Sequence, residues 1–299
     1  MISIHTLLLS LTMISSNPSD PAKDAQRLEK EVTAEFARHK GTYALAFKDL
    51  GTGREILINA HDSFHAASTM KTPVLIETFK QVAAGKFALK DSIVVFNEFK
   101  SIMDGSPYSL DPNDDSEKDL YTKIGTKVTL QNLLYRMITK SSNLATNIVI
   151  EIVGAKNANA TMRAMGAKDI MVLRGVEDDK AFQAGRNNTV TAYDLMLLFD
   201  QLATGKAVSA DASKAMIDIL LDQYFKDVIP AKLPAGVKVA SKSGAIEGII
   251  NDSGIVYLPD GRKYVLIVLS RNAENNATAT ETLATVSKMV YDYYVTAKK

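Results

Sequence analysis

The chain has 299 residues, of which 46% are hydrophobic and 23% are charged, and its formal net charge is +1 at pH 7. This composition is that of a globular protein large enough for one large domain or two subdomains. The lack of cysteine excludes disulfides, thiolate catalysis and zinc–thiolate sites. A near-neutral charge offers no basic surface for nucleic acid. We expect no metal and no cofactor, because the histidines stop at His65 and no glycine-rich nucleotide motif is present.

Residues 1–16 form a short apolar run that ends in small residues and is followed by the polar residues 17–20. This pattern is typical of a signal peptide, although no Lys or Arg precedes the apolar run. The alternative is a frayed N-terminal segment. We expect an exported protein, periplasmic or secreted, with no membrane association once residues 1–16 are removed. No other stretch approaches the roughly 20 apolar residues of a membrane helix.

The first quarter of the chain predicts a helix, a hairpin and a second helix. Apolar residues at helical spacing indicate an amphipathic helix over residues 20–40. Two extended runs, residues 42–48 and 54–59, flank a glycine-containing turn and predict a β-hairpin. A helix that begins at Ser68 and ends near residue 84 follows.

The middle of the chain is mostly helical. Residues 91–126 are less regular and contain two turn clusters. Residues 169–189 are polar and without periodicity, and loops of that length are often functional. Helices are expected over residues 128–140, 143–153, 158–165 and 191–203.

The last third predicts three strands between two helices. The helices are expected over residues 211–225 and 277–296. The last two strands are joined by Pro-Asp-Gly, which is a hairpin signal. The strands are expected over residues 237–243, 249–257 and 263–270.

Strands near both chain ends, with helices between them, predict an α/β fold of the α+β sandwich type. We expect one antiparallel five-stranded sheet flanked by terminal helices, with an inserted all-helical subdomain. The expected catalytic domain is a single one, residues 20–299. Its α/β part would take residues 20–85 and 207–299, and its helical part residues 86–206.

Ser68-Thr69-Met70-Lys71 is the only Ser-x-x-Lys in the chain. Positions i and i+3 of a helix share a face, so a helix that begins at Ser68 places the Lys71 amine beside the Ser68 hydroxyl. A serine hydroxyl needs such a base to become a nucleophile, and a helix N-terminus stabilises the alkoxide. The motif is weak by itself, because about one Ser-x-x-Lys is expected by chance in a chain of this length.

Two further motifs follow in order. Ser141-Ser142-Asn143 lies between two predicted helices, and Lys242-Ser243-Gly244 ends the first late strand. Alone, the former predicts a helix N-cap and the latter a surface strand end. Together with Ser-x-x-Lys, they resemble the Ser-Asp-Asn and Lys-Thr-Gly motifs of class A β-lactamases and penicillin-binding proteins. The chain beyond residue 20 therefore resembles a class A β-lactamase-type serine hydrolase.

The resemblance implies catalytic roles for four residues. Ser68 would be the acylated nucleophile, and Lys71 would help to remove its proton. Ser141 would pass a proton to the leaving nitrogen. Asn143 would bind the substrate amide and orient Lys71.

The resemblance also implies how the substrate is held. Lys242 would supply positive charge near the substrate carboxylate, and Ser243 would offer a hydroxyl beside Gly244. The backbone N–H groups of Ser68 and Ala245 would form the oxyanion hole, a feature worth about 3 kcal/mol for one donor. The implied partner is a small molecule, a β-lactam or a peptidoglycan-derived peptide, bound by a monomer.

Three departures from the family pattern are visible. Ser142 replaces the family's aspartate, so a structural hydrogen-bond network must be arranged differently. The family's Glu-x-x-x-Asn holds the hydrolytic water. Here Glu177 is the candidate glutamate, one residue further from Arg174 than the pattern, and Ala181 stands at the asparagine position. The family's carboxylate-binding arginine is absent from the strand after Gly244, and Arg271 substitutes only if the fold brings it near.

Two function classes stay open besides a β-lactamase that works through an acyl-serine. One is a D-alanyl-D-alanine peptidase or esterase on the same fold, or a slowly deacylating penicillin-binding protein. The other is a sensor that stays acylated. In the polar loop, Asp178 or Asp179 would replace Glu177 as base if the register slips by one residue. His65 lies near the nucleophile, but no downstream histidine supports a Ser-His-Asp arrangement.

Overall fold

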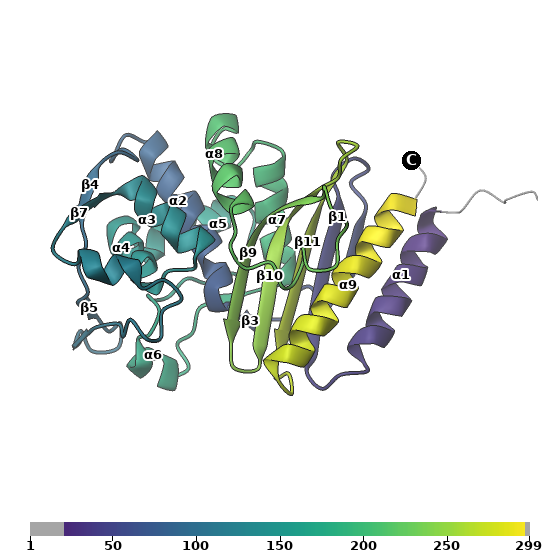
Figure 1. Cartoon of the computed structure of the whole chain (residues 1–299), viewed down its shortest axis with the longest axis horizontal. Coiled ribbons are helices and arrows are strands. Elements are labelled where there is room, and N and C mark those ends of the chain that lie inside the picture. Colours follow the sequence, from purple (N-terminus) through teal and green to yellow (C-terminus); the bar gives the residue numbers. More distant parts are fainter. Residues whose placement is uncertain (1–20, 297–299) are drawn as a thin grey trace, which may run out of the picture.

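A computed structural model describes residues 21–296, and within this range five strands form one antiparallel sheet (Figure 1). The sheet order is β2-β1-β11-β10-β9. Thr42 lies opposite Arg271 and Asp49 opposite Tyr264, so strands from the two ends of the chain meet in the centre of the sheet. The predicted sheet is therefore confirmed. Its strands are β1 (Thr42–Asp49), β2 (Glu55–Ile58), β9 (Lys238–Ile246), β10 (Ile249–Tyr257) and β11 (Lys263–Arg271).

One face of the sheet is covered by the terminal helices α1 (Pro21–Phe36) and α9 (Asn276–Thr296), which also pack on each other (Figure 1). Alternate residues of a strand point to opposite faces, so a sheet buried on both sides has continuous apolar strands. The face under α1 and α9 carries Tyr43, Leu45, Phe47, Tyr264, Leu266 and Val268. The opposite face carries Ala44, Ala46, Val265, Ile267 and Leu269.

The opposite face packs against α7 (Ala192–Ala203) and α8 (Ala210–Leu221). Residues 192–203 thus lie on the sheet, whereas the sequence grouped them with the helical part. The Thr191 hydroxyl accepts a hydrogen bond from the Asp194 N–H, as an N-cap does. Beyond these helices lie α2 (Lys71–Ala83), α3 (Leu130–Thr139), α4 (Asn143–Val153) and α5 (Ala155–Ala164) (Figure 1).

The segment 169–189, expected to be an irregular loop, is more ordered than its sequence indicated. It contains the short helix α6 (Asp179–Gln183) and ends in β8 (Thr189–Val190), which pairs with β3 (Phe64–His65). Elements of two or three residues are too short to give a periodic signal. The others of this kind are β4 (Ser92–Val94) with β7 (Lys127–Thr129) and β5 (Phe99–Lys100) with β6 (Pro107–Tyr108). The 3-10 helix η2 (Asp119–Lys123) is also short.

Two helices end earlier than expected, the first of them being the helix expected over residues 20–40, which ends at Phe36. The helix predicted to reach residue 225 ends at Leu221. Beyond it, the Gln223 side-chain amide donates to the carbonyl oxygens of Ile138 and Ser241. These buried hydrogen bonds tie the segment to both α3 and β9, which a continuing helix would not allow.

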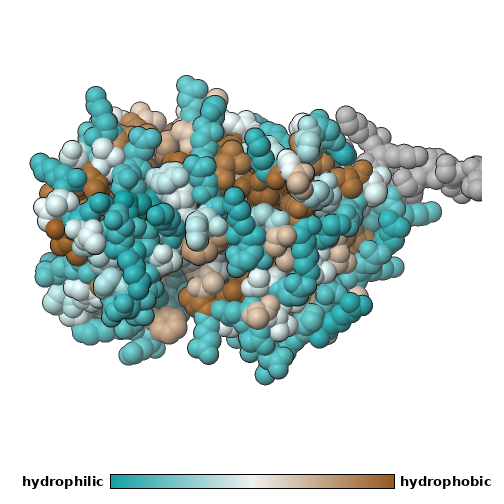
Figure 2. Space-filling model, in the orientation of Figure 1, coloured by the Kyte–Doolittle hydropathy of each residue, from teal (hydrophilic) through white to brown (hydrophobic). Residues whose placement is uncertain are grey.

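The surface seen in Figure 2 is mainly hydrophilic, with hydrophobic side chains showing between the polar ones. Within residues 21–296, no helix combines the length and apolar character needed to cross a membrane. The predicted signal peptide, residues 1–16, lies outside the described residues.

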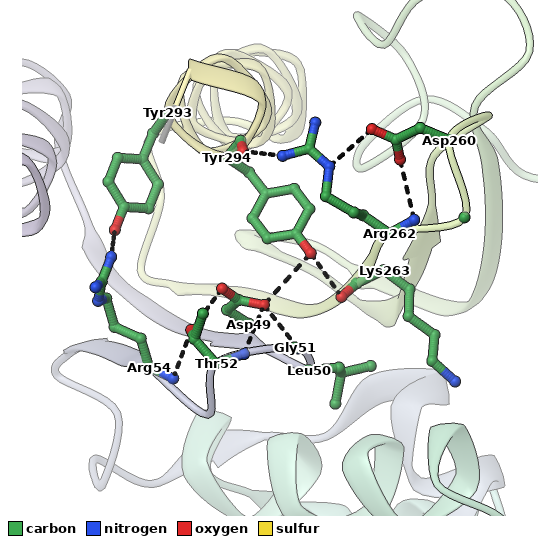
Figure 3. Close-up of a pocket in the computed structure, with 11 residues that line it drawn as sticks. Asp49, Leu50, Gly51, Thr52, Arg54, Asp260, Arg262, Lys263, Tyr293 and Tyr294 are labelled. Atoms are coloured by element: carbon green, nitrogen blue, oxygen red, sulfur yellow. Dashed lines mark hydrogen bonds and ion pairs between the residues drawn. The ribbon is translucent and has the colours of Figure 1, made fainter. Parts of the chain in front are cut away.

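A cavity of about 600 Å³ lies where the turns that follow β1 and β10 meet the last turns of α9 (Figure 3). The Arg54 guanidinium donates to the Tyr293 hydroxyl, and the Tyr294 hydroxyl donates to the Lys263 carbonyl oxygen. Arg262 donates to the Tyr294 carbonyl oxygen. These bonds hold α9 against the end of the sheet. The residues that line this cavity include none of the candidate site residues named from the sequence.

The close pairing of β9 and β10 depends on Gly254. A β-carbon at this position would lie 2.7 Å from the Ala240 carbonyl oxygen and 2.8 Å from the Ser241 β-carbon. We predict that Gly254→Ala lowers the free energy of unfolding by about 1–3 kcal/mol, because the strands must move apart. Urea denaturation measures this. Gly51→Ala is the control and should cost less, since its nearest neighbour is a side-chain oxygen of Asp49 at 3.3 Å. Equal effects in the two variants would contradict the packing explanation.

Candidate active site

Ser68 lies in the 3-10 turn η1 (Ala67–Met70), which continues directly into α2 at Lys71. The predicted helix start is therefore present, with a tighter first turn. Gly244 of β9 lies against this turn, because a β-carbon there would be 2.7 Å from the Ser68 nitrogen. Any side chain at residue 244 would push β9 away from Ser68. Glycine in the third motif is thus required for the sheet edge to run alongside the first motif.

The Lys71 side chain is completely buried and joins the first motif to the second. Its Nζ donates to the Ser141 carbonyl oxygen at 2.6 Å, to Ser141 Oγ at 3.0 Å and to Asn143 Oδ1 at 3.1 Å. Burial lowers the pKa of Lys71 to about 7, although the charges of Asp115 and Glu177 raise it. A lysine with this pKa is partly neutral at neutral pH, so its amine can accept a proton. Within residues 21–296, the Ser68 hydroxyl makes no hydrogen bond.

Ser141 lies between the two buried lysines. Its backbone is left-handed, with φ +57°. Its Oγ accepts from Lys71 Nζ at 3.0 Å and from Lys242 Nζ at 3.1 Å. Lys242 Nζ also donates to the Ser243 carbonyl oxygen at 2.7 Å. Burial and the charge of Lys71 hold the pKa of Lys242 well below its ordinary value, against the opposing effect of Asp252. The hydroxyl of Ser141 therefore connects two amines that can each supply or take a proton.

Asn143 connects Lys71 to Glu177. Its Oδ1 accepts from Lys71, and its Nδ2 donates to Glu177 Oε1 at 2.8 Å. Burial raises the pKa of the Glu177 carboxyl, the hydrogen bond from Asn143 lowers it, and the charge of Asp115 raises it. Glu177 has φ +61°, an unusual conformation for this residue type. The structure thus brings Glu177 into the group in spite of its shifted position in the sequence.

The loop that carries Glu177 is fixed by Asn147 of α4. Asn147 Oδ1 accepts from the Val176 N–H at 2.7 Å, and its Nδ2 donates to the Val176 carbonyl oxygen at 3.0 Å. A β-carbon at Gly175 would lie 2.5 Å from Asn147 Oδ1. The sequence did not assign Asn147 a role. The available signal was a polar residue on a mainly apolar helix. The Tyr108 hydroxyl adds a weaker contact to the same carbonyl oxygen at 3.4 Å.

The neighbouring acidic residues are placed differently. The buried Asp178 carboxylate accepts from Ser101 Oγ at 2.8 Å, from the Ile102 N–H at 2.9 Å and from the Ala181 N–H at 3.2 Å. These bonds occupy both oxygens of Asp178, so it caps α6 and holds the loop. Asp179 is exposed. Ala181 is buried and contributes only its backbone, without the side-chain amide of the family pattern.

Asp115 supplies the carboxylate that Ser142 lacks. Asp115 Oδ2 accepts from the N–H groups of Asn143 at 2.8 Å and Leu144 at 3.0 Å, and from the Tyr121 hydroxyl at 2.9 Å. The carboxylate thus lies at the N-terminus of α4, where it is stabilised by the helix dipole. Ser142 is the N-cap of α4, as its residue type predicted. The sequence assigned Asp115 only to a turn cluster, because its contact with α4 is made by folding.

Two adjoining cavities open beside Ser68. The smaller, about 250 Å³, is lined by Ser68 together with Ser141, Asn143, Ser243, Gly244 and Ala245. The larger, about 670 Å³, shares Ser68, Asn143 and Ala245 and is also lined by Glu177. Lys71 and Lys242 lie buried next to these cavities. The structure therefore brings together Ser68, Lys71, Ser141, Asn143, Glu177 and residues 242–245.

Arg271, which would replace the carboxylate-binding arginine only if the fold brought it near, does not reach the site. Arg271 donates to the Ser63 carbonyl oxygen and to Asp62, and its guanidinium stacks on the Phe64 ring. Among the described residues, Arg174 is the one arginine that lines either cavity. Its guanidinium nitrogens donate to three oxygens of its own loop, those of Gly175, Arg186 and Asn187.

Comparison with known proteins agrees with this geometry. An extended-spectrum beta-lactamase, PER-1 of Pseudomonas aeruginosa, is 24% identical and covers 95% of this chain and 92% of its own length. A beta-lactamase of Bacteroides uniformis is 27% identical, with 91% and 92% covered. The crystal structure of a beta-lactamase from Sphaerobacter thermophilus superposes with a TM-score of 0.77 at 26% identity, covering 90% of this chain and 97% of that one.

The structure of PBP-A is equally similar, with a TM-score of 0.79 and 25% identity, covering 91% of this chain and 97% of that one. The family model described as "Beta-lactamase enzyme family" matches residues 27–294. That match spans both parts of the fold and all three motifs. The chain belongs to the beta-lactamase enzyme family, and it is a serine hydrolase of the β-lactamase type.

Proposed function

We propose that this protein is a class A β-lactamase in which Ser68 forms the acyl-enzyme. The observation that supports this most strongly is one continuous set of hydrogen bonds beside Ser68. It runs from Glu177 through Asn143 to Lys71, and from there through Ser141 to Lys242. Each group that acyl transfer needs is a member of this set or lies next to it.

In the proposed acylation, the neutral Lys71 amine takes the Ser68 proton while Ser68 Oγ attacks the β-lactam carbonyl. The bond to the ring nitrogen then breaks. Ser141 Oγ gives its proton to that nitrogen and receives one from Lys71 or Lys242, so that protons balance. The N–H groups of Ser68 and Ala245 stabilise the tetrahedral oxyanion.

In the proposed deacylation, the Glu177 carboxylate takes a proton from a water that attacks the acyl carbonyl. The ester bond to Ser68 Oγ then breaks, Ser68 Oγ takes a proton from Lys71 or Glu177, and the opened acid leaves, so that bonds and protons balance. The raised pKa of Glu177 makes it a stronger base than an exposed glutamate. Ala181 has no side-chain amide to hold that water, so we expect slow turnover. This observation favours the second candidate, a slowly deacylating penicillin-binding protein or a D-alanyl-D-alanine peptidase or esterase on the same fold.

Substrate binding is proposed to involve Ser243, which lines the smaller cavity, together with Lys242, which supplies positive charge near the substrate carboxylate. Gly244 and Ala245 would contribute through their backbone.

Further proposals rest on the sequence alone. They are export through residues 1–16 to the periplasm or the medium, a part in β-lactam resistance, a monomer, and a single catalytic domain.

The first test concerns the nucleophile. We predict that Ser68→Ala gains no penicillin mass in intact mass spectrometry, whereas the wild type gains the mass of one penicillin. The matched control is Ser116→Ala, which removes another serine hydroxyl from the lining of the same cavity and should still be acylated. A Ser68→Ala variant that acquires the adduct would show that another residue is the nucleophile.

The second test concerns the base. A group with a pKa of about 7 that acts as a base is active above that pH, so acylation should fall about tenfold from pH 8 to pH 6. Lys71→Ala should slow acylation by about 10²–10⁴ and remove this pH dependence. Ser141→Ala should slow it less, because a water can partly replace a hydroxyl. Stopped-flow acylation across pH 5–9 measures both, and a wild-type rate in Lys71→Ala would refute its role.

The third test concerns deacylation. Glu177→Gln should trap the acyl-enzyme with little change in acylation, because the amide cannot take a proton from water. Pre-steady-state kinetics with a chromogenic cephalosporin separate the two steps. Asp179→Asn is the control, since this exposed residue lines the same cavity and should keep the wild-type turnover. Unchanged turnover in Glu177→Gln would leave the loop without a catalytic role and would favour the peptidase or esterase.

A further inference from the structure

The His65 side chain is folded back onto the backbone that precedes the nucleophile. Its Nδ1 accepts a hydrogen bond from the Ala67 N–H, with the two nitrogens 3.0 Å apart. His65 belongs to β3, whose backbone pairs with Thr189 of β8. The residue also lines the larger of the two cavities beside Ser68. None of the catalytic steps described above uses this side chain.

Ala67 has a conformation that needs support. Its φ is +43°, in the left-handed region that β-carbons disfavour. Such residues persist only where the surrounding structure holds them. The peptide group between His65 and Ala66 is held by two hydrogen bonds, since the Ala66 N–H donates to the Asn188 carbonyl oxygen at 2.9 Å and Asn251 Nδ2 donates to the His65 carbonyl oxygen at 3.0 Å. Within residues 21–296, the imidazole of His65 is the group that bonds the Ala67 N–H itself.

The hydrogen bond fixes the protonation state of the imidazole. Nδ1 can accept only when it carries no proton, so the ring is neutral with its proton on Nε2. Burial lowers the pKa of His65, the charge of Arg174 lowers it further, and Asn187 partly offsets this. The neutral form is therefore the one present at pH 7. An imidazole engaged in this way holds backbone geometry and is not placed as the base for Ser68.

We propose that His65 is a positioning residue for acyl transfer. By accepting the Ala67 N–H, its Nδ1 holds the left-handed turn that directs the Ser68 hydroxyl and the Ser68 N–H toward the substrate carbonyl. The proposal rests on the proposed function, because it assigns His65 to the presentation of the acylated serine. A displacement of about 1 Å at a reacting group can cost 10²-fold in rate. Loss of the hydrogen bond that holds the turn at Ala67 would therefore slow acylation of Ser68.

Three substitutions separate positioning from general structural support. His65→Leu removes the acceptor and keeps an apolar side chain of moderate size. His65→Asn keeps an acceptor that reaches the N–H two residues ahead, as in an Asx-turn, and it does not titrate. Ala67→Gly removes the need for support, because glycine adopts a positive φ without a steric penalty.

The experiment measures the second-order rate of penicillin acylation by time-resolved intact mass spectrometry at pH 7.5, together with the Tm. His65→Leu should acylate about 10- to 100-fold more slowly than the wild type, with a Tm within a few degrees of it. His65→Asn should recover a rate within roughly fivefold of the wild type, since the acceptor is restored. Adding Ala67→Gly to His65→Leu should recover part of the lost rate, since the turn no longer needs the bond.

Several outcomes would overturn the proposal. They are a wild-type rate in His65→Leu, a rate in His65→Asn as low as in His65→Leu, and no recovery on adding Ala67→Gly. If His65→Leu lacks a cooperative thermal transition, His65→Ala takes its place. Loss of folding in both would show that the side chain supports the fold instead. A wild type that gains no penicillin would overturn the proposed function and this inference with it, whereas an acylated wild type isolates the role of His65.

Discussion

The burial of the Lys71 amine is the interaction on which the rest of the site depends. An ammonium in an apolar interior is costly unless it is hydrogen-bonded, and three oxygens from the second motif provide those bonds. The same bonds fix the start of α4 against the start of α2. Burial also brings the pKa of Lys71 to about 7, which converts an ordinary cation into a usable base. Structure and chemistry therefore depend on one buried group.

The sheet contributes by bringing its edge close to Ser68. Gly244 permits β9 to approach the Ser68 nitrogen. Lys242 of the same strand donates a hydrogen bond to Ser141 Oγ. The helical part contributes Ser141 and Asn143, and the ordered loop contributes Glu177. The site is thus assembled where the two parts of the fold meet, so no single part can form it alone.

Much of the fold was predictable, because long apolar strands and amphipathic helices carry strong periodic signals. The five strands and the helix that follows Ser68 are of this kind. The short strand β3 and the contacts of Asp115 and Asn147 were not, since they depend on segments distant in the sequence. Motif spacing singled out Ser68, Lys71 and the lysine of the third motif as candidates. It could not show that Lys71 is buried, because burial depends on where α4 packs.

The residues at which the loop departs from the family pattern, Glu177 and Ala181, were visible in the sequence. The structural consequence of these departures was not. A shift of one residue at Glu177 is absorbed by its left-handed backbone and by the hydrogen bonds of Asn147 to Val176. The missing amide at Ala181 has no such replacement among the described residues. Acylation is therefore better supported by the structure than deacylation.

The central claim is that Ser68 becomes acylated. The most direct measurement is peptide mapping by tandem mass spectrometry after a short exposure to penicillin and digestion with trypsin. The peptide between the cleavage sites at Arg54 and Lys71 contains two serines, Ser63 and Ser68. We predict that fragment ions place the penicillin adduct on Ser68. An adduct on Ser63, on a peptide from elsewhere in the chain, or on no peptide at all would contradict the claim.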